Sequence, residues 1–221
     1  LSAGLDYYVG DPISPATTIL VWMENNLIGS NKFAYQVSSE IESINAIIGA
    51  GYAGKKAMTA TAGPGIALMS EGLGLAWMAE IPLVVVDVQR GGPATGLPTK
   101  SEQSDLFACM HPAHGDVKIP ILAPGSVEEC FYAAALAVNW AERYQGPVIL
   151  MSEMAQAERG ENIPKPNLDK IKVESRNIYS GDNGFKRYQS WDGTNELTPM
   201  PIPGGSGAYV ANGSEHDEIG D

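Results

Sequence analysis

The sequence predicts an α/β fold built on a parallel β-sheet, and two observations lead to this prediction. Short runs of apolar and β-branched residues alternate with helical patterns between residues 7 and 152, which is the rhythm of repeated βαβ units. The run Leu83-Val-Val-Val-Asp-Val88 is apolar almost throughout, as expected for a central strand covered on both faces. We therefore expect six parallel strands in one sheet with helices on both sides.

Each strand can be placed, in order, before a helical pattern. Strands are expected at residues 7–10, 33–37, 57–62, 83–88, 119–123 and 147–152, and helices from residue 15 and at 40–53, 66–79, 104–110 and 127–144. Ser14 is expected to cap the first helix ahead of Pro15, and Ser126 and Glu129 to form a capping box for the last one.

The two parts of the chain differ in composition. From about residue 155 the sequence is rich in proline, glycine and asparagine and has little periodicity, which is typical of extended or linking segments. We expect an α/β domain over residues 1–154 and an irregular arm over residues 155–221.

Composition excludes several classes of function. With a net charge of -12 and no cluster of Lys or Arg, the chain is not expected to bind nucleic acid or an anionic membrane. Neither a transmembrane span nor a signal peptide is expected, and the chain is interpreted as cytoplasmic. Cys109 and Cys130 are far apart, so no disulfide framework, zinc site or iron–sulfur cluster is expected within this chain. A redox centre would then belong to a partner.

A glycine-rich turn is the sequence's most informative local feature. The run Thr59-Ala-Thr-Ala-Gly-Pro-Gly65 leads from a strand into a nearly uncharged helix. Glycines at such a turn allow a cofactor or another backbone to approach closely, so Gly63 and Gly65 are candidate cofactor-binding positions. A tight turn with no ligand would explain the same two glycines.

Several motifs in order resemble those of one family. They are Asp11-Pro-Ile-Ser-Pro15, Ala57-Met-Thr-Ala-Thr-Ala-Gly-Pro-Gly65, Met69-Ser-Glu-Gly-Leu-Gly-Leu75, Val88-Gln-Arg-Gly-Gly-Pro-Ala-Thr-Gly-Leu-Pro-Thr-Lys100, His114-Gly-Asp116 and Glu215-His-Asp-Glu218. Together they resemble the α subunit of 2-oxoacid:ferredoxin (or flavodoxin) oxidoreductases, most closely the 2-oxoglutarate type. The resemblance implies a three-layer parallel-sheet fold of the thiamine diphosphate pyrimidine-binding type. It begins partway through the family's first helix and stops where a further domain would begin, so a fragment truncated at both ends is expected.

The resemblance also implies a catalytic residue and a reaction. Counting back from Gly49-Ala50 places Glu40 at the position of the family's activating glutamate, whose carboxyl drives the tautomeric shift of the coenzyme's aminopyrimidine. The implied reaction converts a 2-oxoacid, expected to be 2-oxoglutarate, and coenzyme A into acyl-CoA, CO₂ and reduced ferredoxin. From the residues alone, Glu40 could be an acidic first-turn residue favoured by the helix dipole.

Two residues are implied to hold the substrate. Arg90, at the end of a strand, would bind the 2-oxoacid carboxylate as a bidentate pair, and Ser14 would donate a hydroxyl. An ion pair of Arg90 with Asp87 or Asp105, and a plain helix cap at Ser14, are the structural alternatives. Asp11 stands where the family has tyrosine, and its carboxylate would repel an anionic substrate by about 1 kcal/mol or more unless a cation compensates.

The cofactor is expected to be shared with a second chain. The Gly-Asp-Gly motif that binds Mg²⁺ and the diphosphate is missing, since the nearest run is Ser180-Gly-Asp-Asn183. A β subunit would therefore carry the diphosphate and Mg²⁺, iron–sulfur clusters would lie in partner chains, and ferredoxin or flavodoxin would take the electrons. Two alternatives stay open: the pyrimidine-domain half of a non-oxidative thiamine diphosphate decarboxylase or synthase, and a non-catalytic scaffold that dimerises through this fold.

Overall fold

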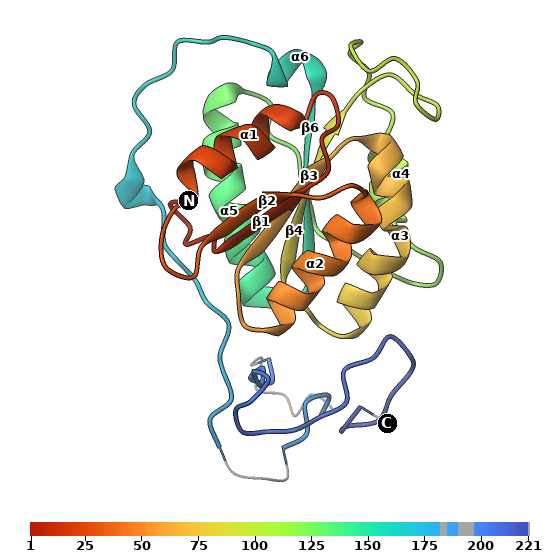
Figure 1. Cartoon of the computed structure of the whole chain (residues 1–221), viewed down its shortest axis with the longest axis vertical. Coiled ribbons are helices and arrows are strands. Elements are labelled where there is room, and N and C mark those ends of the chain that lie inside the picture. Colours follow the sequence, from red (N-terminus) through yellow and green to blue (C-terminus); the bar gives the residue numbers. More distant parts are fainter. Residues whose placement is uncertain (182–184, 190–196, 221) are drawn as a thin grey trace.

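The computed structural model describes residues 1–181, 185–189 and 197–220. Its centre is a sheet of six parallel strands in the order β2-β1-β3-β4-β6-β5 (Figure 1). The strands are β1 (Tyr7–Gly10), β2 (Phe33–Gln36), β3 (Ala57–Thr61), β4 (Leu83–Gln89), β5 (Ile121–Leu122) and β6 (Pro147–Glu153). The parallel six-stranded sheet predicted from the sequence is confirmed.

Helices cover both faces of this sheet and complete three layers (Figure 1). They are α1 (Thr17–Asn26), α2 (Glu40–Tyr52), α3 (Gly63–Met78), α4 (Leu106–Met110), α5 (Val127–Tyr144) and the short α6 (Met154–Ala157). Successive side chains of β4 point to opposite faces of the sheet, so the core has two halves. Val85 packs with α2 and α3 on one face, and Val84 and Val86 pack with α1 and α5 on the other. All seven residues of β4 are buried, as the apolar run predicted.

The start of α1 differs from the prediction. Ser14 does not cap this helix, since α1 begins at Thr17 with Ala16 as its N-cap residue and without a side-chain cap. A turn closed by the hydrogen bond from the Thr17 amide to the Ile13 carbonyl (3.0 Å) precedes the helix. The Ser14 carbonyl instead accepts a hydrogen bond from Arg90, which holds Ser14 outside the helix.

The predicted cap of α5 is present with one change. The Ser126 hydroxyl accepts a hydrogen bond from the Glu129 amide (3.2 Å), as in a capping box. The Glu129 carboxylate, however, accepts from the amide of Gly125 (2.7 Å), one residue before the cap. Two of the helix-start amides are satisfied in this way.

Where the structure describes it, the arm after α6 is irregular apart from the 3₁₀ turn η1 (Leu168–Lys170), and it passes beneath the amino-terminal edge of the sheet (Figure 1). The buried guanidinium of Arg176 binds the Glu142 carboxylate of α5 and the carbonyl oxygens of Gly51 (2.7 Å) and Lys55 (2.9 Å). The arm is thus fixed to the domain by polar contacts. Its division from the domain at residue 154 stays a prediction. No helix in the described part of the chain is long and apolar enough to cross a membrane.

Candidate cofactor site

Glu40 is the first residue of α2 and lies at the carboxyl edge of the sheet, just after β2. Ser39 caps this helix by accepting a hydrogen bond from the Ile41 amide (3.2 Å). The Glu40 side chain points inward and the residue is only 7% exposed. Glu42, in the same turn, lies on the surface and accepts hydrogen bonds from Ser38. Of these two acidic residues, only Glu40 is buried. The helix dipole would stabilise both carboxylates equally, so it does not explain this difference.

The Glu40 carboxyl packs against the start of α3. A Cβ atom added at Gly65 would lie 2.8 Å from Oε1 of Glu40, 2.7 Å from its Cγ and 1.9 Å from the Thr61 hydroxyl. That hydroxyl lies 3.5 Å from Oε1, at the outer limit of a hydrogen bond. Gly65 is therefore required so that the glutamate can occupy this place. The turn alone does not account for it.

Gly63 has a comparable role toward a different acid. A Cβ atom at this position would lie 2.7 Å and 2.8 Å from the two carboxylate oxygens of Asp105. The two glycines predicted as cofactor positions thus leave room for carboxyl groups on either side of the amino end of α3. Their contact with a cofactor stays a prediction.

The loop after β1 joins the predicted residues. Asp11 directly follows β1, and its carboxyl lies near enough to Glu40 for the two charges to interact. Partial burial and then the charge of Glu40 raise the pKa of Asp11 above its usual value. Three residues further on, the Ser14 carbonyl accepts a hydrogen bond from Arg90 (2.7 Å). The same loop therefore lies near Glu40 and contacts Arg90.

Arg90 is buried at the carboxyl end of β4, and its guanidinium binds backbone carbonyls. Nη1 donates to Ser14 and Nη2 donates to Thr95 (3.0 Å), so the predicted alternative of a pair with Asp87 or Asp105 is not what holds this side chain. The buried Nε has no hydrogen-bond partner. The Ser14 side chain is exposed, since only its backbone takes part in this contact.

A buried acidic cluster was not found by reasoning from the sequence. Asp87 is fully buried in β4, and its Oδ2 accepts a hydrogen bond from the Cys109 thiol (3.6 Å). Burial, assisted by the charge of Asp105, raises the pKa of Asp87 to about 8. Burial likewise raises the pKa of Cys109. A charged residue within an otherwise apolar strand was the available signal, but the sequence did not show what faces it.

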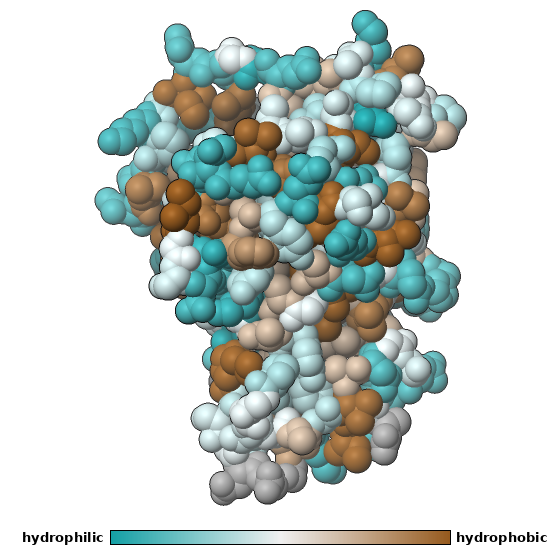
Figure 2. Space-filling model, in the orientation of Figure 1, coloured by the Kyte–Doolittle hydropathy of each residue, from teal (hydrophilic) through white to brown (hydrophobic). Residues whose placement is uncertain are grey.

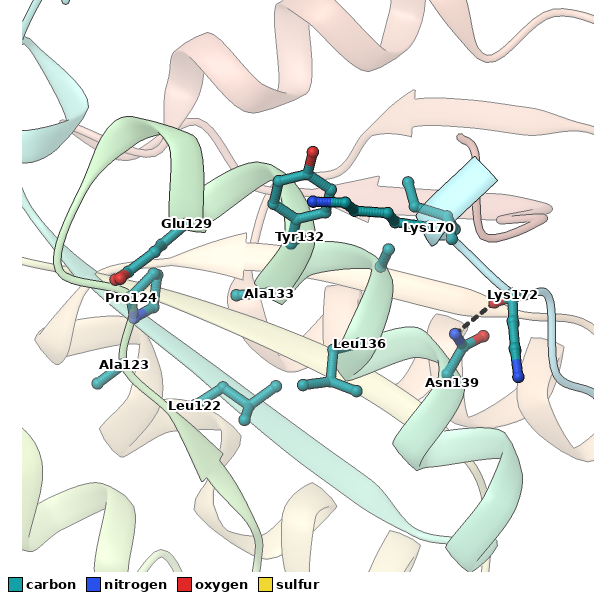
Figure 3. Close-up of a pocket in the computed structure, with 12 residues that line it drawn as sticks. Leu122, Ala123, Pro124, Glu129, Tyr132, Ala133, Leu136, Asn139, Lys170 and Lys172 are labelled. Carbon is teal, nitrogen blue, oxygen red and sulfur yellow. Dashed lines mark hydrogen bonds between the residues drawn. The ribbon is translucent and has the colours of Figure 1, made fainter. Parts of the chain in front are cut away.

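A groove of about 450 Å³ lies elsewhere, along α5 beside the edge strand β5 (Figure 3). Its lining includes Leu122, Tyr132, Leu136, Asn139 and Lys170, and none of the predicted site residues. We therefore do not assign the cofactor to it. Within the described ranges, no group of three or more His, Cys, Asp or Glu residues is arranged to hold a metal ion. Residues 182–184, which include part of the Ser180-Gly-Asp-Asn183 run, lie outside those ranges.

The three-layer parallel sheet, together with the comparisons that follow, is that of a thiamine diphosphate-binding domain of the pyrimidine type. All 221 residues match the family described as pyruvate flavodoxin/ferredoxin oxidoreductase, thiamine diphosphate-binding, and the chain belongs to that family. The sequence resemblance to the α subunits of these oxidoreductases is therefore confirmed.

Individual relatives agree with this assignment. The chain is 39% identical to the 2-oxoglutarate synthase subunit KorA of Methanocaldococcus jannaschii, covering all of this chain and 59% of that protein. It is 40% identical to the 2-oxoglutarate oxidoreductase subunit KorA of Mycobacterium tuberculosis, covering 96% of this chain and 33% of that one. The chain thus spans between one third and three fifths of these two curated relatives.

Two solved structures show the extent of the likeness. A 2-oxoglutarate:ferredoxin oxidoreductase from Magnetococcus marinus, solved with 2-oxoglutarate, coenzyme A and succinyl-CoA bound, is 42% identical with a TM-score of 0.93. The match covers 99% of this chain and 38% of that one. Benzoylformate decarboxylase from Polynucleobacter necessarius is 18% identical with a TM-score of 0.56, and covers 80% of this chain and 32% of its own. The second likeness shows the fold alone.

Proposed function

We propose that this chain is the pyrimidine-binding part of the α subunit of a 2-oxoacid:ferredoxin oxidoreductase. The proposed reaction is the oxidative decarboxylation of a 2-oxoacid, with 2-oxoglutarate as the expected substrate, and coenzyme A to acyl-CoA, CO₂ and reduced ferredoxin. Membership of the family and the 42% identity to an enzyme solved with 2-oxoglutarate and coenzyme A support this choice of reaction.

One observation carries the proposal. The Glu40 carboxyl is buried at the carboxyl edge of a parallel sheet and packs on a helix whose third residue, Gly65, has no side chain to displace it. Ligands of open parallel sheets bind at this edge. The residues present therefore fit a heterocycle that needs one carboxyl in a water-poor setting.

Each site residue has a defined task in this proposal. When bound, thiamine diphosphate supplies the nucleophilic carbon and the electron sink for decarboxylation. Glu40 holds a proton at the pyrimidine nitrogen N1′, and its burial keeps water from competing for that contact. Gly63 and Gly65 keep the start of α3 narrow enough for the ring to approach.

Arg90 and Ser14 are proposed to bind the carboxylate of the oxoacid. The guanidinium of Arg90 is fixed by two carbonyl groups, and its Nε is buried without a partner. A buried donor of this kind is costly unless it is satisfied, which favours a bound acceptor near it. The exposed Ser14 hydroxyl lies on the same loop.

The remaining parts of the enzyme are proposed to lie in partner chains. A β subunit would bind Mg²⁺ and the diphosphate, iron–sulfur clusters would be held by partner chains, and ferredoxin or flavodoxin would receive the electrons. A partner surface is available, because apolar side chains are exposed on the side that carries α2, α3 and α4, including Ile41, Leu68, Phe107 and Met110 (Figure 2). A cytoplasmic location accompanies the proposal, supported by the free thiols of Cys109 and Cys130.

The proposal is tested by Glu40→Gln in the enzyme assembled with its partner chains. Glutamine keeps the shape of the side chain but cannot exchange a proton with N1′, so we expect the reduction of ferredoxin or a viologen dye by 2-oxoglutarate and coenzyme A to fall by about 100-fold or more. A panel of other 2-oxoacids, assayed in the same way, identifies the preferred substrate.

Glu42→Gln is the matched control, because Glu42 lies in the same helical turn but on the surface. It should retain turnover. An unchanged rate in Glu40→Gln would contradict the proposal and favour the scaffold alternative. Release of an aldehyde or acyloin without an electron acceptor would instead favour the non-oxidative decarboxylase.

A further inference from the structure

Strand β3 presents two buried threonines to the layer formed by α2 and α3. Thr59 and Thr61 are both fully buried, and they alternate with Met58 and Ala60, which pack with α1 and α5 on the other face of the sheet. The Thr61 hydroxyl lies 3.5 Å from Oε1 of Glu40. The Thr59 hydroxyl has no hydrogen-bond partner among the described residues. The two threonines are therefore a matched pair, of which only Thr61 contacts the candidate site.

The start of α3 sets the place of the Thr61 hydroxyl. A Cβ atom at Gly65 would lie 1.9 Å from this hydroxyl and 2.8 Å from Oε1 of Glu40, so both groups occupy the space that this glycine leaves. The hydroxyl also lies 3.4 Å from the Ala62 carbonyl. A hydroxyl has one proton to donate, and an ionised carboxylate is a stronger acceptor than a carbonyl. The ionised Glu40 carboxylate therefore receives this hydrogen bond.

A hydroxyl group suits a carboxyl that changes its protonation state. It donates a hydrogen bond to the carboxylate, and through its lone pairs it accepts one from the protonated carboxyl. A cationic neighbour would favour the ionised form alone, and an apolar neighbour would favour the neutral form. The Thr61 hydroxyl can therefore hold Oε1 of Glu40 while this carboxyl gives and takes a proton.

We propose that Thr61 is a positioning residue whose hydroxyl holds Oε1 of Glu40 and thereby directs the other carboxylate oxygen, Oε2, toward the pyrimidine ring of the cofactor. This inference rests on the proposed role of Glu40. Thr61 acts through the carboxyl and not on the cofactor itself. Loss of the hydroxyl lets the carboxyl rotate to other positions, which weakens its contact with N1′ and slows turnover.

Two substitutions at position 61 separate the hydroxyl from the methyl group. In the enzyme assembled with its partner chains, Thr61→Val keeps the β-branched shape but removes the hydroxyl, and it should lower kcat/KM for 2-oxoglutarate by about 10-fold. Thr61→Ser keeps the hydroxyl and should retain most of the activity. A role in packing alone would give the reverse order, with Thr61→Ser less active than Thr61→Val. Thr59→Val is the matched control on the same face of β3 and should leave kcat/KM unchanged.

Binding of thiamine diphosphate and Mg²⁺ to the assembled apoenzyme provides a readout that does not depend on turnover. Calorimetric titration should show weaker binding in Thr61→Val than in the unsubstituted enzyme. Adding Thr61→Val to Glu40→Ala should weaken binding no further, because the carboxyl through which Thr61 acts is then missing. Equal weakening in both backgrounds would overturn the inference, as would a Thr61→Val enzyme with unchanged affinity and turnover.

The result for Glu40→Gln separates a failure of this inference from a failure of the proposed function. If Glu40→Gln loses turnover while Thr61→Val keeps it, Thr61 has no positioning role and the proposed function stands. If Glu40→Gln keeps its turnover, both the proposed function and the role of Thr61 are wrong.

Discussion

Two buried carboxyl groups in this protein have different environments and different uses. Glu40 lies at the carboxyl edge of the sheet and is 7% exposed, whereas Asp87 lies within β4 and is fully buried. Asp87 has one carboxylate oxygen without a partner, and Asp105 nearby has another. A strongly raised pKa often marks a functional group, but a side chain that no solvent reaches cannot contact a substrate. We interpret Asp87 as a residue kept protonated in the core.

This protonation makes stability depend on pH. The pKa of Asp87 is about 8 in the folded chain and close to 3.8 in the unfolded one. Between these values the folded chain keeps a proton that the unfolded chain has released, so the free energy of unfolding falls as pH rises from about 4 to about 8. One such group changes the free energy of unfolding by at most about 1.4 kcal/mol per pH unit. Asp87→Asn should flatten this slope, as measured by urea unfolding at several pH values. Asp169→Asn, on the exposed η1 turn, serves as the control and should leave the slope unchanged.

At the scale of secondary structure, the first turn of α3 decides the shape of the site. Its glycines place backbone where other helices would place side chains, and the carboxyl groups of Glu40 and Asp105 occupy the space. The composition of the helix follows from this arrangement. Ala62 is the N-cap residue of this helix and provides no side-chain cap.

We expect Gly65→Ala to be destabilising and to reduce activity. The new Cβ would lie 1.9 Å from the Thr61 hydroxyl and 2.7 Å from Cγ of Glu40, so both side chains must move at a cost of about 1–3 kcal/mol. Gly49→Ala is the control, since Gly49 lies within α2 and a Cβ there meets nothing within 4 Å. It should stabilise the chain by about 0.5–1 kcal/mol through helix propensity. Equal effects of the two substitutions in thermal or urea unfolding would contradict this account of Gly65.

At the scale of the whole molecule, three arginine–glutamate pairs join the described part of the arm to the domain: Arg176–Glu142, Arg143–Glu174 and Arg187–Glu80. Arg176 and Glu142 are both buried, and the arm's own backbone amide at Arg176 also binds Glu142 (3.0 Å). Arg143 and Glu174 form the second pair at the surface. Between them, the Asn139 side chain binds the backbone of Lys172 (2.6 Å) and Glu174 (3.0 Å). The buried pair is expected to dominate, because exposed pairs are screened by water.

Arg176→Met should release the arm. It leaves Glu142 buried without its partner, which costs about 3–5 kcal/mol, and adding Glu142→Met should recover part of that loss. Limited proteolysis within the arm and urea unfolding measure the two effects. Arg143→Met is the control at the exposed pair and should change both little. An arm equally resistant to protease in Arg176→Met would show that other contacts hold it.

Local features of the sequence were sufficient to predict much of this protein. The apolar run of β4, the cap at Ser126 and the glycines in the first turn of α3 each depend on neighbouring residues, so they can be recognised without a structure. The family motifs added Glu40, which is buried, and its catalytic role stays a prediction. The predicted roles of Ser14 and Arg90 toward substrate stay predictions.

Contacts between distant residues were decided only by the tertiary structure. The cap predicted at Ser14 is absent because α1 begins at Thr17, and the Ser14 carbonyl binds Arg90, 76 positions away. The contact of Asp87 with Cys109 and that of Glu40 with Thr61 also join separate elements. A sequence determines which side chains are available and which face of a helix or strand they occupy. Which of them contact one another depends on how those elements pack together.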